Sequence, residues 1–219
     1  MNKLRLRFEK TDRAIYISHL DLMRTMQRAF NRAGYALKYS EGFNPRPQIS
    51  IALPLSVGMG SVCEIMDFTL KEDPDLAELP ERLTQAMPEG IRVIEAYEPQ
   101  RKSALLKWLA IRGVFEYDER DPAVMCPALQ AFFDREEIVI LRRTKRGEGE
   151  SDIRPAIRSL SFTPGEKCVA LEGVISAQNP TLNPDLLADA LRQLQPEIAP
   201  DFAKFTRIDT YDEEGKIFR

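Results

Sequence analysis

The order of strand-like and helix-like segments constrains the fold more than any other feature of the chain. In the first half, alternation with a period of two residues predicts strands, and a period of about 3.6 residues predicts helices. The predicted segments are, in order, strand 3–9, helix 18–33, strand 48–53, strand 63–70, helix 74–87 and strand 91–97. This β-α-β-β-α-β order is typical of the split βαβ, or ferredoxin-like, plan.

The second half repeats this order, with a longer hairpin in its middle. Its predicted segments are strand 109–117, helix 123–133, strand 137–143, a hairpin of strands 153–162 and 167–174, helix 184–194 and strand 202–211. A polar connector over 98–106 separates the halves, and a charged, glycine-rich loop is expected over 145–151. We therefore predict an α+β protein of two tandem ferredoxin-like units with antiparallel sheets, one domain over residues 1–100 and the other over 107–219.

Composition excludes several classes of protein. The sequence has no apolar run of about 18 residues, so a transmembrane helix is not expected. Its first residues, MNKLRLRFEK, alternate charge and hydrophobe and lack the apolar core of a signal peptide. Cys63, Cys126 and Cys168 are too widely spaced for a disulfide framework or for the clustered ligands of zinc and iron–sulfur sites. We expect a cytoplasmic protein with no membrane contact and no bound cofactor or metal.

The charge of the chain is distributed unevenly. The whole sequence carries 31 lysines and arginines against 34 acidic residues, a net charge of −3. Residues 1–50 hold ten basic and four acidic residues, a net charge of +6, which leaves −9 for the remainder. The global acidic balance argues against indiscriminate nucleic-acid binding, whereas the basic first quarter is compatible with one anion-binding surface.

One stretch of the first half contains many unusual residues in register. They are Ser18-His19-Leu20-Asp21, Arg24, Arg28-Ala29, Arg32-Ala33-Gly34, Tyr39-Ser40, Gly42-Phe43-Asn44-Pro45, Pro47 and the segment 58–64. Together they resemble the radical SAM-linked protein family, a domain of unknown function fused to, or encoded beside, a cobalamin-binding radical SAM protein. Beyond residue 70 the best match is the segment 152–155. The resemblance implies a radical SAM protein as partner, and it brings no established activity, substrate or catalytic residue.

Three arginines are predicted to line one side of the helix over 18–33. Arg24, Arg28 and Arg32 recur every four residues, which places them in one row that we call the arginine stripe. Lys38 and Arg46 follow this stripe in the sequence. Guanidinium groups about 6 Å apart match a phosphate backbone, so the stripe predicts an RNA-binding surface. The alternative is a solvated charged face that binds nothing.

A second group of basic residues lies on the first strand. Lys3, Arg5 and Arg7 share one side of it, because side chains alternate along a strand. The helices of a split βαβ unit cover one face of the sheet, and the apolar residues between these three are expected to face them. The basic side would then form a platform on the open face that contacts nucleic acid. The alternative is a plain solvent-facing strand.

The single histidine and the loop after the helix are the remaining candidates. His19 lies near the predicted helix start and is a candidate acid or base for RNA cleavage, or else a residue hydrogen-bonded to Asp21 or to the loop 44–47. The loop, which lacks the spacing of a phosphate-binding motif, either reverses the chain or holds Arg46 and backbone N–H groups beside the stripe as an anion nest. Its residues are Gly42, Phe43, Asn44, Pro45, Arg46 and Pro47.

Three functions are consistent with these patterns. The first is a non-catalytic RNA-binding or adaptor subunit that acts with a radical SAM enzyme, in tRNA or rRNA modification. The second is a metal-independent endoribonuclease that uses His19. The third is a protein-interaction module that binds no nucleic acid. Salt-dependent RNA binding separates the first two from the third, and cleavage lost in a His19→Ala variant separates the second from the first.

Overall fold

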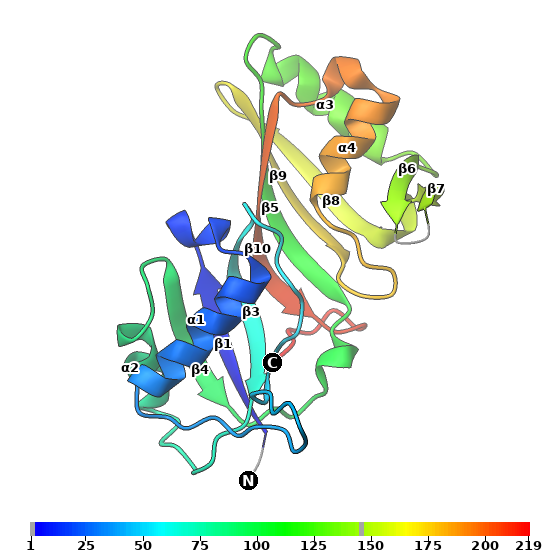
Figure 1. The fold of residues 1–219 in the computed structure, drawn as a ribbon. Coiled ribbons are helices and arrows are strands. Elements are labelled where there is room, and N and C mark those ends of the chain that lie inside the picture. Colours follow the sequence, from blue (N-terminus) through cyan, green and yellow to red (C-terminus); the bar gives the residue numbers. More distant parts are fainter. Residues whose placement is uncertain (1–2, 145–146) are drawn as a thin grey trace. The chain divides into compact units, whose positions relative to one another are not determined.

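The structure is a computed structural model that describes residues 3–144 and 147–219. The chain divides into two compact units, residues 1–105 together with Arg219 and residues 106–218. Each unit combines antiparallel strands with two α-helices, so the protein has a mixed α+β fold (Figure 1). Short 3-10 helices cover Asp12–Tyr16, Ser103–Leu105, Arg154–Ala156 and Pro196–Ile198.

The N-terminal unit contains six regular elements in the predicted sequence. They are β1 (Leu4–Lys10), α1 (His19–Arg32), β2 (Ile49–Ile51), β3 (Gly60–Phe68), α2 (Leu79–Gln85) and β4 (Ile91–Tyr97). The strands lie side by side in the order β4-β1-β3-β2, and every neighbouring pair is antiparallel. The element order predicted for the first half is therefore confirmed.

The core of this unit lies between the sheet and its two helices. Leu6 and Phe8 of β1 are fully buried there with Met26 and Phe30 of α1. The rings of Phe30 and Phe68 lie 5.0 Å apart, centroid to centroid, and so join α1 to β3. Because apolar residues alternate on β1 and recur with the helical period on α1, each element turns its apolar side toward this core.

Helix α1 begins and ends where the sequence indicates. The Oγ of Ser18 accepts a hydrogen bond from the Asp21 amide at 3.2 Å, which satisfies one of the unpaired donors of the first turn. Ala33 ends the helix, and Gly34 follows with a φ of +82°, a conformation that glycine adopts without strain. The helix predicted over 18–33 is confirmed.

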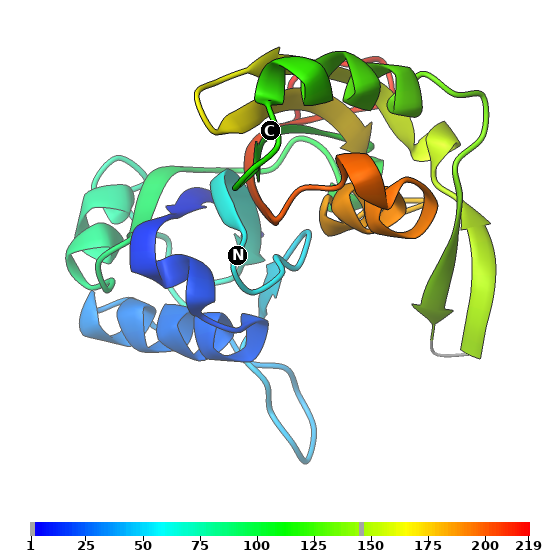
Figure 2. The same ribbon diagram turned by 90° about the horizontal axis from the view of Figure 1, so that it is seen from above.

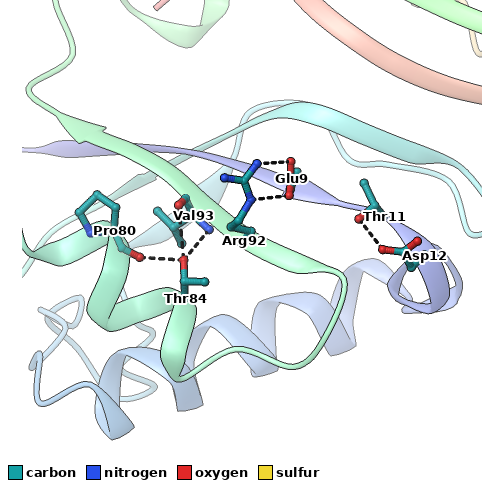
Figure 3. Close-up of polar contacts among 7 residues, drawn as sticks. All are labelled: Glu9, Thr11, Asp12, Pro80, Thr84, Arg92 and Val93. Atoms are coloured by element: carbon teal, nitrogen blue, oxygen red, sulfur yellow. Dashed lines mark hydrogen bonds and ion pairs between the residues drawn. The ribbon is translucent and has the colours of Figure 1, made fainter.

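Polar contacts tie α2 and β4 to the rest of the unit (Figure 3). The hydroxyl of Thr84 donates to the Pro80 carbonyl at 2.8 Å and accepts from the Val93 amide at 3.0 Å, which holds α2 against β4. Arg92 on β4 donates to both carboxylate oxygens of Glu9 on β1, at 2.6 and 3.0 Å. The Thr84 contacts thus hold α2 against β4, and the Arg92 contacts hold β4 against β1.

The C-terminal unit also combines antiparallel strands with two α-helices. Its elements are β5 (Trp108–Glu116), α3 (Pro122–Phe133), β6 (Val139–Thr144), β7 (Gly147–Asp152), β8 (Ile157–Pro164), β9 (Cys168–Ser176), α4 (Asp185–Leu194) and β10 (Phe202–Tyr211). The strand order is β10-β5-β9-β8. The Phe133 ring stacks on Phe162 at 5.7 Å, and Phe115 packs edge-on to Phe205 at 5.9 Å, so aromatic contacts fill this core.

Three sequence predictions need correction. Residues 147–151 of the loop predicted over 145–151 lie in β7, and the strand predicted over 137–143, observed as β6, pairs with β7 in a separate two-stranded sheet. Residues 145 and 146 of the predicted loop lie outside the described residues. The helix predicted over 74–87 is confined to Leu79–Gln85, because the Asp75 carboxylate accepts from the Ala77 amide at 2.8 Å and holds a turn before the helix.

Candidate functional site

The three arginines of the stripe lie on α1, exposed and at the predicted spacing, but each has a different environment. Arg24 donates to Asp21 at 2.9 Å, an exposed ion pair within one turn. Arg32 donates to the Ala86 carbonyl at the end of α2. The side chain of Arg28 makes no hydrogen bond or ion pair with any residue in the described ranges. Arg28 is therefore the member of the stripe whose charge is left for a ligand.

Arg32 has a counterpart on the neighbouring helix. Arg82 of α2 donates to the Ala33 carbonyl at 2.8 Å, and its guanidinium lies 4.8 Å from the centre of the Tyr35 ring. Ala33 ends α1 and Ala86 ends α2, so each arginine binds the last turn of the other helix. Cations are favoured at helix C-termini, where carbonyl groups lack intrahelical partners. These crossed arginine contacts hold the two helix ends together.

A groove of about 720 Å³ lies between α1 and α2. Its polar lining consists of Thr25, Arg28, Arg32, Arg82 and Gln85. No carboxylate is among the described residues that line it; the nearest in sequence, Glu81, accepts a hydrogen bond from Gln85 at 3.3 Å. Three guanidinium groups around an open groove suit an anion with several acceptor oxygens, such as a phosphate. We call this site the arginine groove.

The sequence patterns did not identify Arg82 and Gln85 as site residues, because residue spacing predicts neighbours within one helix only. Arg82 reaches the groove through the packing of α2 beside α1, which no local pattern reveals. One signal was available: both Arg32 and Arg82 lie in the last turn of a helix, where a cation is favoured. That signal predicts a structural contact and not a ligand.

The crossed contacts give a stability prediction. Arg32→Ala and Arg82→Ala should each lower the free energy of unfolding by about 0.3–1 kcal/mol, because each removes a cation from a helix C-terminus. Arg28→Ala should lower it by less than about 0.5 kcal/mol, because the Arg28 side chain is exposed and has no ion pair or hydrogen bond with the described residues. Urea unfolding followed by circular dichroism measures all three. An equal loss of stability in the three variants would contradict the conclusion that Arg32 and Arg82 stabilise the helix ends and Arg28 does not.

Lys38 and Arg46 do not line the arginine groove. Both side chains are exposed, and neither makes an ion pair within the described part of the chain. The Arg46 amide, expected to contribute to an anion nest, donates instead to the Ser40 Oγ at 3.0 Å, while the Ser40 amide donates to the Arg46 carbonyl at 2.8 Å. The nest beside the stripe is therefore absent from the described loop, because its own residues satisfy these groups. Gly42, Phe43, Asn44 and Pro45 are exposed between them, and Pro47 pairs with Tyr39.

The prediction that Lys3, Arg5 and Arg7 form an open basic platform on β1 is wrong. Arg5 is 1% exposed and donates to both carboxylate oxygens of Asp67, at 2.6 and 3.2 Å. Lys3, which is exposed, also reaches Asp67 at 2.7 Å, and the half-buried Arg7 lies 3.5 Å from Glu95. Strand register explains this, because Asp67 lies opposite Arg5 and Glu95 opposite Arg7.

His19 lies at the start of α1 and is half-buried. Its Nδ1 is buried and makes no hydrogen bond in the described structure. Hydrogen bonds from Ser18 and then Arg24 lower the pKa of Asp21, whose carboxylate they occupy. The expected hydrogen bond from His19 to Asp21 or to the loop 44–47 is therefore wrong, since Asp21 is already engaged by closer groups.

No three His, Cys, Asp or Glu residues within 3–144 and 147–219 lie close enough to hold a metal ion. No helix in those ranges combines the length and apolar character needed to cross a membrane. Cys63 is buried, and Cys126 and Cys168 are half-buried; all three are free thiols.

The fold and the groove define a mixed α+β protein with a cationic surface between two helices. The chain belongs to the family described as "Uncharacterized protein conserved in bacteria (DUF2344)", which matches residues 3–184. Nothing in that description links the family to radical SAM proteins. A search of curated proteins finds no match.

Two solved structures are similar to the chain. One is described as "Crystal Structure of a Cbf5-Nop10-Gar1 Complex"; the identity is 10% and the TM-score 0.51, over 96% of this chain and 50% of that chain. The protein thus spans about half the length of that chain, and the likeness is one of fold alone. The other is "Crystal Structure of an Unknown Protein from Galdieria sulphuraria", with 10% identity and a TM-score of 0.27, over 94% of this chain and 98% of that one.

Proposed function

We propose that this protein is a non-catalytic RNA-binding subunit whose arginine groove contacts the phosphate backbone. The observation that carries this proposal is that Arg28, Arg32 and Arg82 surround one open groove that no carboxylate of the described residues lines. Arg28 offers its whole guanidinium group, because it has no partner among the described residues. The charge of +6 on residues 1–50 supports an anionic ligand for this unit.

The other two arginines favour binding through their fixed positions. Arg32 and Arg82 each use part of the guanidinium on a backbone carbonyl, and a guanidinium has five N–H donors. The remaining N–H donors are available to a ligand. Because the carbonyl contact already orders each arginine side chain, less conformational entropy is lost on binding. Planar, forked donors match the paired oxygens of a phosphate better than a lysine ammonium does.

The fold supports the same proposal at a coarser level. The strand orders β4-β1-β3-β2 and β10-β5-β9-β8 have the same connectivity when the β6–β7 hairpin is set aside. We therefore propose that both units are ferredoxin-like and arose as a tandem pair. This fold hosts many functions, so the RNA proposal depends on the groove and not on the architecture.

A radical SAM enzyme is the proposed partner, and the support for it is the resemblance of residues 18–64. In that arrangement the partner performs the chemistry, and this chain holds and orients the RNA. Isolation of the tagged full chain from cells, with proteins and RNA both identified, tests the pairing. Recovery of RNA without any radical SAM protein would contradict the partnership and leave RNA binding intact. The endoribonuclease alternative gains no support, because the His19 Nδ1 makes no hydrogen bond with any described residue.

The RNA proposal predicts a change in salt dependence. Arg28→Ala should reduce the slope of log affinity against log salt by about 0.7 for a single-stranded RNA, because one phosphate contact is lost. Arg28→Lys should keep most of the slope, since the charge is retained. Fluorescence anisotropy of a labelled oligouridylate at several salt concentrations measures it.

Arg13 provides the matched control. It is an exposed arginine of the same unit that does not line the groove, so Arg13→Ala should leave the slope unchanged. If Arg28→Ala and Arg13→Ala behave alike, the groove is not the RNA contact. If the wild-type protein does not bind RNA at all, the proposed function is wrong.

A further inference from the structure

The loop between α1 and β2 forms a projecting finger, defined here as residues 38–48. Tyr39 pairs with Pro47 across its base, and the Gln48 amide donates to the Lys38 carbonyl at 2.8 Å. Above this base, the two hydrogen bonds between Ser40 and Arg46 close the finger. In Figure 2 the finger extends away from the sheet and helices of its own unit. Three hydrogen bonds thus hold the base of the finger, and the residues at its tip, 41–45, are exposed.

The tip presents an aromatic ring to solvent. Phe43 is 106% exposed, the largest exposure of any large apolar residue among those described. Gly42 turns the chain immediately before it with a φ of +119°, a conformation that glycine adopts without strain. Tyr39, at the base, is 44% exposed. A single ring held out on a closed finger gains nothing for folding, because burial of apolar area is what stabilises a fold.

The finger that carries Phe43 also carries two positively charged residues. The side chains of Lys38 and Arg46 are exposed and have no ion pair within the described chain. Glu41 is the one carboxylate of the finger, and it too is exposed. Two unpaired cations beside two exposed aromatic rings is the combination by which proteins hold a single strand: the cations follow the phosphates, and bases stack on the rings.

We propose that the finger binds single-stranded RNA by stacking Phe43 on an unpaired base, with Lys38 and Arg46 on the adjacent phosphates. This inference rests on the proposed RNA-binding function and names its substrate class, a segment with at least one unstacked base. Bases inside a duplex are stacked on each other and offer no free face to Phe43. The finger therefore selects single-stranded over double-stranded RNA, while the arginine groove reads charge alone.

A protein pocket is the competing occupant, and the area available argues against it. One phenylalanine ring buries about 150–250 Å², whereas a stable protein interface takes about 800 Å² from each partner. The remaining residues of the tip are a glutamate, a glycine, an asparagine and a proline, which add little apolar area. A base face has the size of one ring, and the flanking positive charges complement a polyanion.

The test uses three substitutions at one exposed position of the full chain. Phe43→Ala should weaken binding of a labelled twelve-nucleotide oligouridylate about 5-fold to 150-fold, the factor that corresponds to ~1–3 kcal/mol for one stacked base. Phe43→Trp should bind at least as tightly as wild type, because it restores an aromatic face. Phe43→Leu should behave like Phe43→Ala, because it restores apolar area without that face. Circular dichroism should show all three folded as wild type.

Two further measurements separate this inference from the proposed function. Phe43→Ala should leave the salt slope unchanged, because no charge is removed, whereas Arg46→Ala should lower it by about 0.7. A twelve-base-pair RNA duplex should bind wild type and Phe43→Ala equally. If Phe43→Ala binds oligouridylate as wild type does while Arg28→Ala lowers the slope, the stacking inference is wrong and the groove stands.

Three further outcomes would overturn the stacking inference. If Phe43→Leu binds like wild type, the ring is an apolar contact and stacking is excluded. If Phe43→Ala abolishes co-isolation of a cellular protein and leaves oligouridylate binding unchanged, the finger is a protein contact and the inference is overturned. If wild type binds neither the oligouridylate nor the duplex, both the inference and the proposed function are wrong.

Discussion

Asp67→Asn should lower the free energy of unfolding of the N-terminal unit by about 3–5 kcal/mol, the loss typical of a buried ion pair that keeps only one partner. Arg5 and Asp67 are 1% and 4% exposed, and two hydrogen bonds of 2.6 and 3.2 Å join them across β1 and β3. Without the carboxylate, the Arg5 guanidinium remains buried with its charge no longer balanced by Asp67. Urea unfolding followed by circular dichroism measures the loss.

The Glu9–Arg92 pair is the matched control, because it too joins β1 to a neighbouring strand through two hydrogen bonds (Figure 3). Arg92 is 60% exposed, so water already solvates it and screens the pair. Glu9→Gln should therefore cost less than about 1 kcal/mol. Similar losses in the two variants would show that burial does not set the strength of these contacts.

The same carboxylate gives an acid dependence. Burial of Asp67 raises its pKa, but hydrogen bonds from Arg5 and Lys3 and their charges outweigh burial and hold the pKa below its ordinary value. The contribution of Asp67 is present above the unfolded-state pKa of about 3.9 and is lost as the pH falls through the lower folded-state pKa. Stability of the Asp67→Asn variant should consequently fall less steeply than that of wild type below about pH 4.

Phe30→Ala should lower the free energy of unfolding by about 3–5 kcal/mol, because it empties a packed site in the core of the N-terminal unit. Phe30 is fully buried, and its ring lies 5.0 Å from that of Phe68. The same substitution at Phe43, in the same unit, removes a ring with no buried area and should leave stability unchanged. Thermal unfolding of the two variants is the measurement. A loss at Phe43 comparable to that at Phe30 would mean that the finger packs against the unit in solution.

Local patterns were sufficient for elements whose stabilising contacts are also local. Helix α1 was predicted because its cap, its apolar period and its terminal glycine all lie within one stretch of sequence. Strand β7 was missed because Gly147–Asp152 has no apolar alternation, and it is a strand through backbone pairing with β6. The late start of α2 depends on one side-chain hydrogen bond of Asp75, which composition does not reveal.

In the candidate site, too, features set by local sequence were predicted and features set by distant contacts were not. The spacing of Arg24, Arg28 and Arg32 predicted their row correctly, because helix geometry fixes it. The burial of Arg5 depends on Asp67, 62 residues away in sequence, and on the register between two strands. The entry of Arg82 into the groove likewise depends on how two helices pack. Contacts between distant segments were the part that residue patterns did not predict.

The crossed arginine contacts link occupancy of the groove to the integrity of its walls. Drawing Arg32 or Arg82 away from its carbonyl would uncap the opposite helix, so a ligand that competes for those N–H groups would weaken the surface that binds it. A ligand that approaches the unused edges of both guanidiniums adds to the existing bonds and tightens the helix pair. For the proposed anion binding, this predicts that a ligand contacting the unused N–H groups of Arg32 and Arg82 is favoured over one that displaces either arginine from its carbonyl.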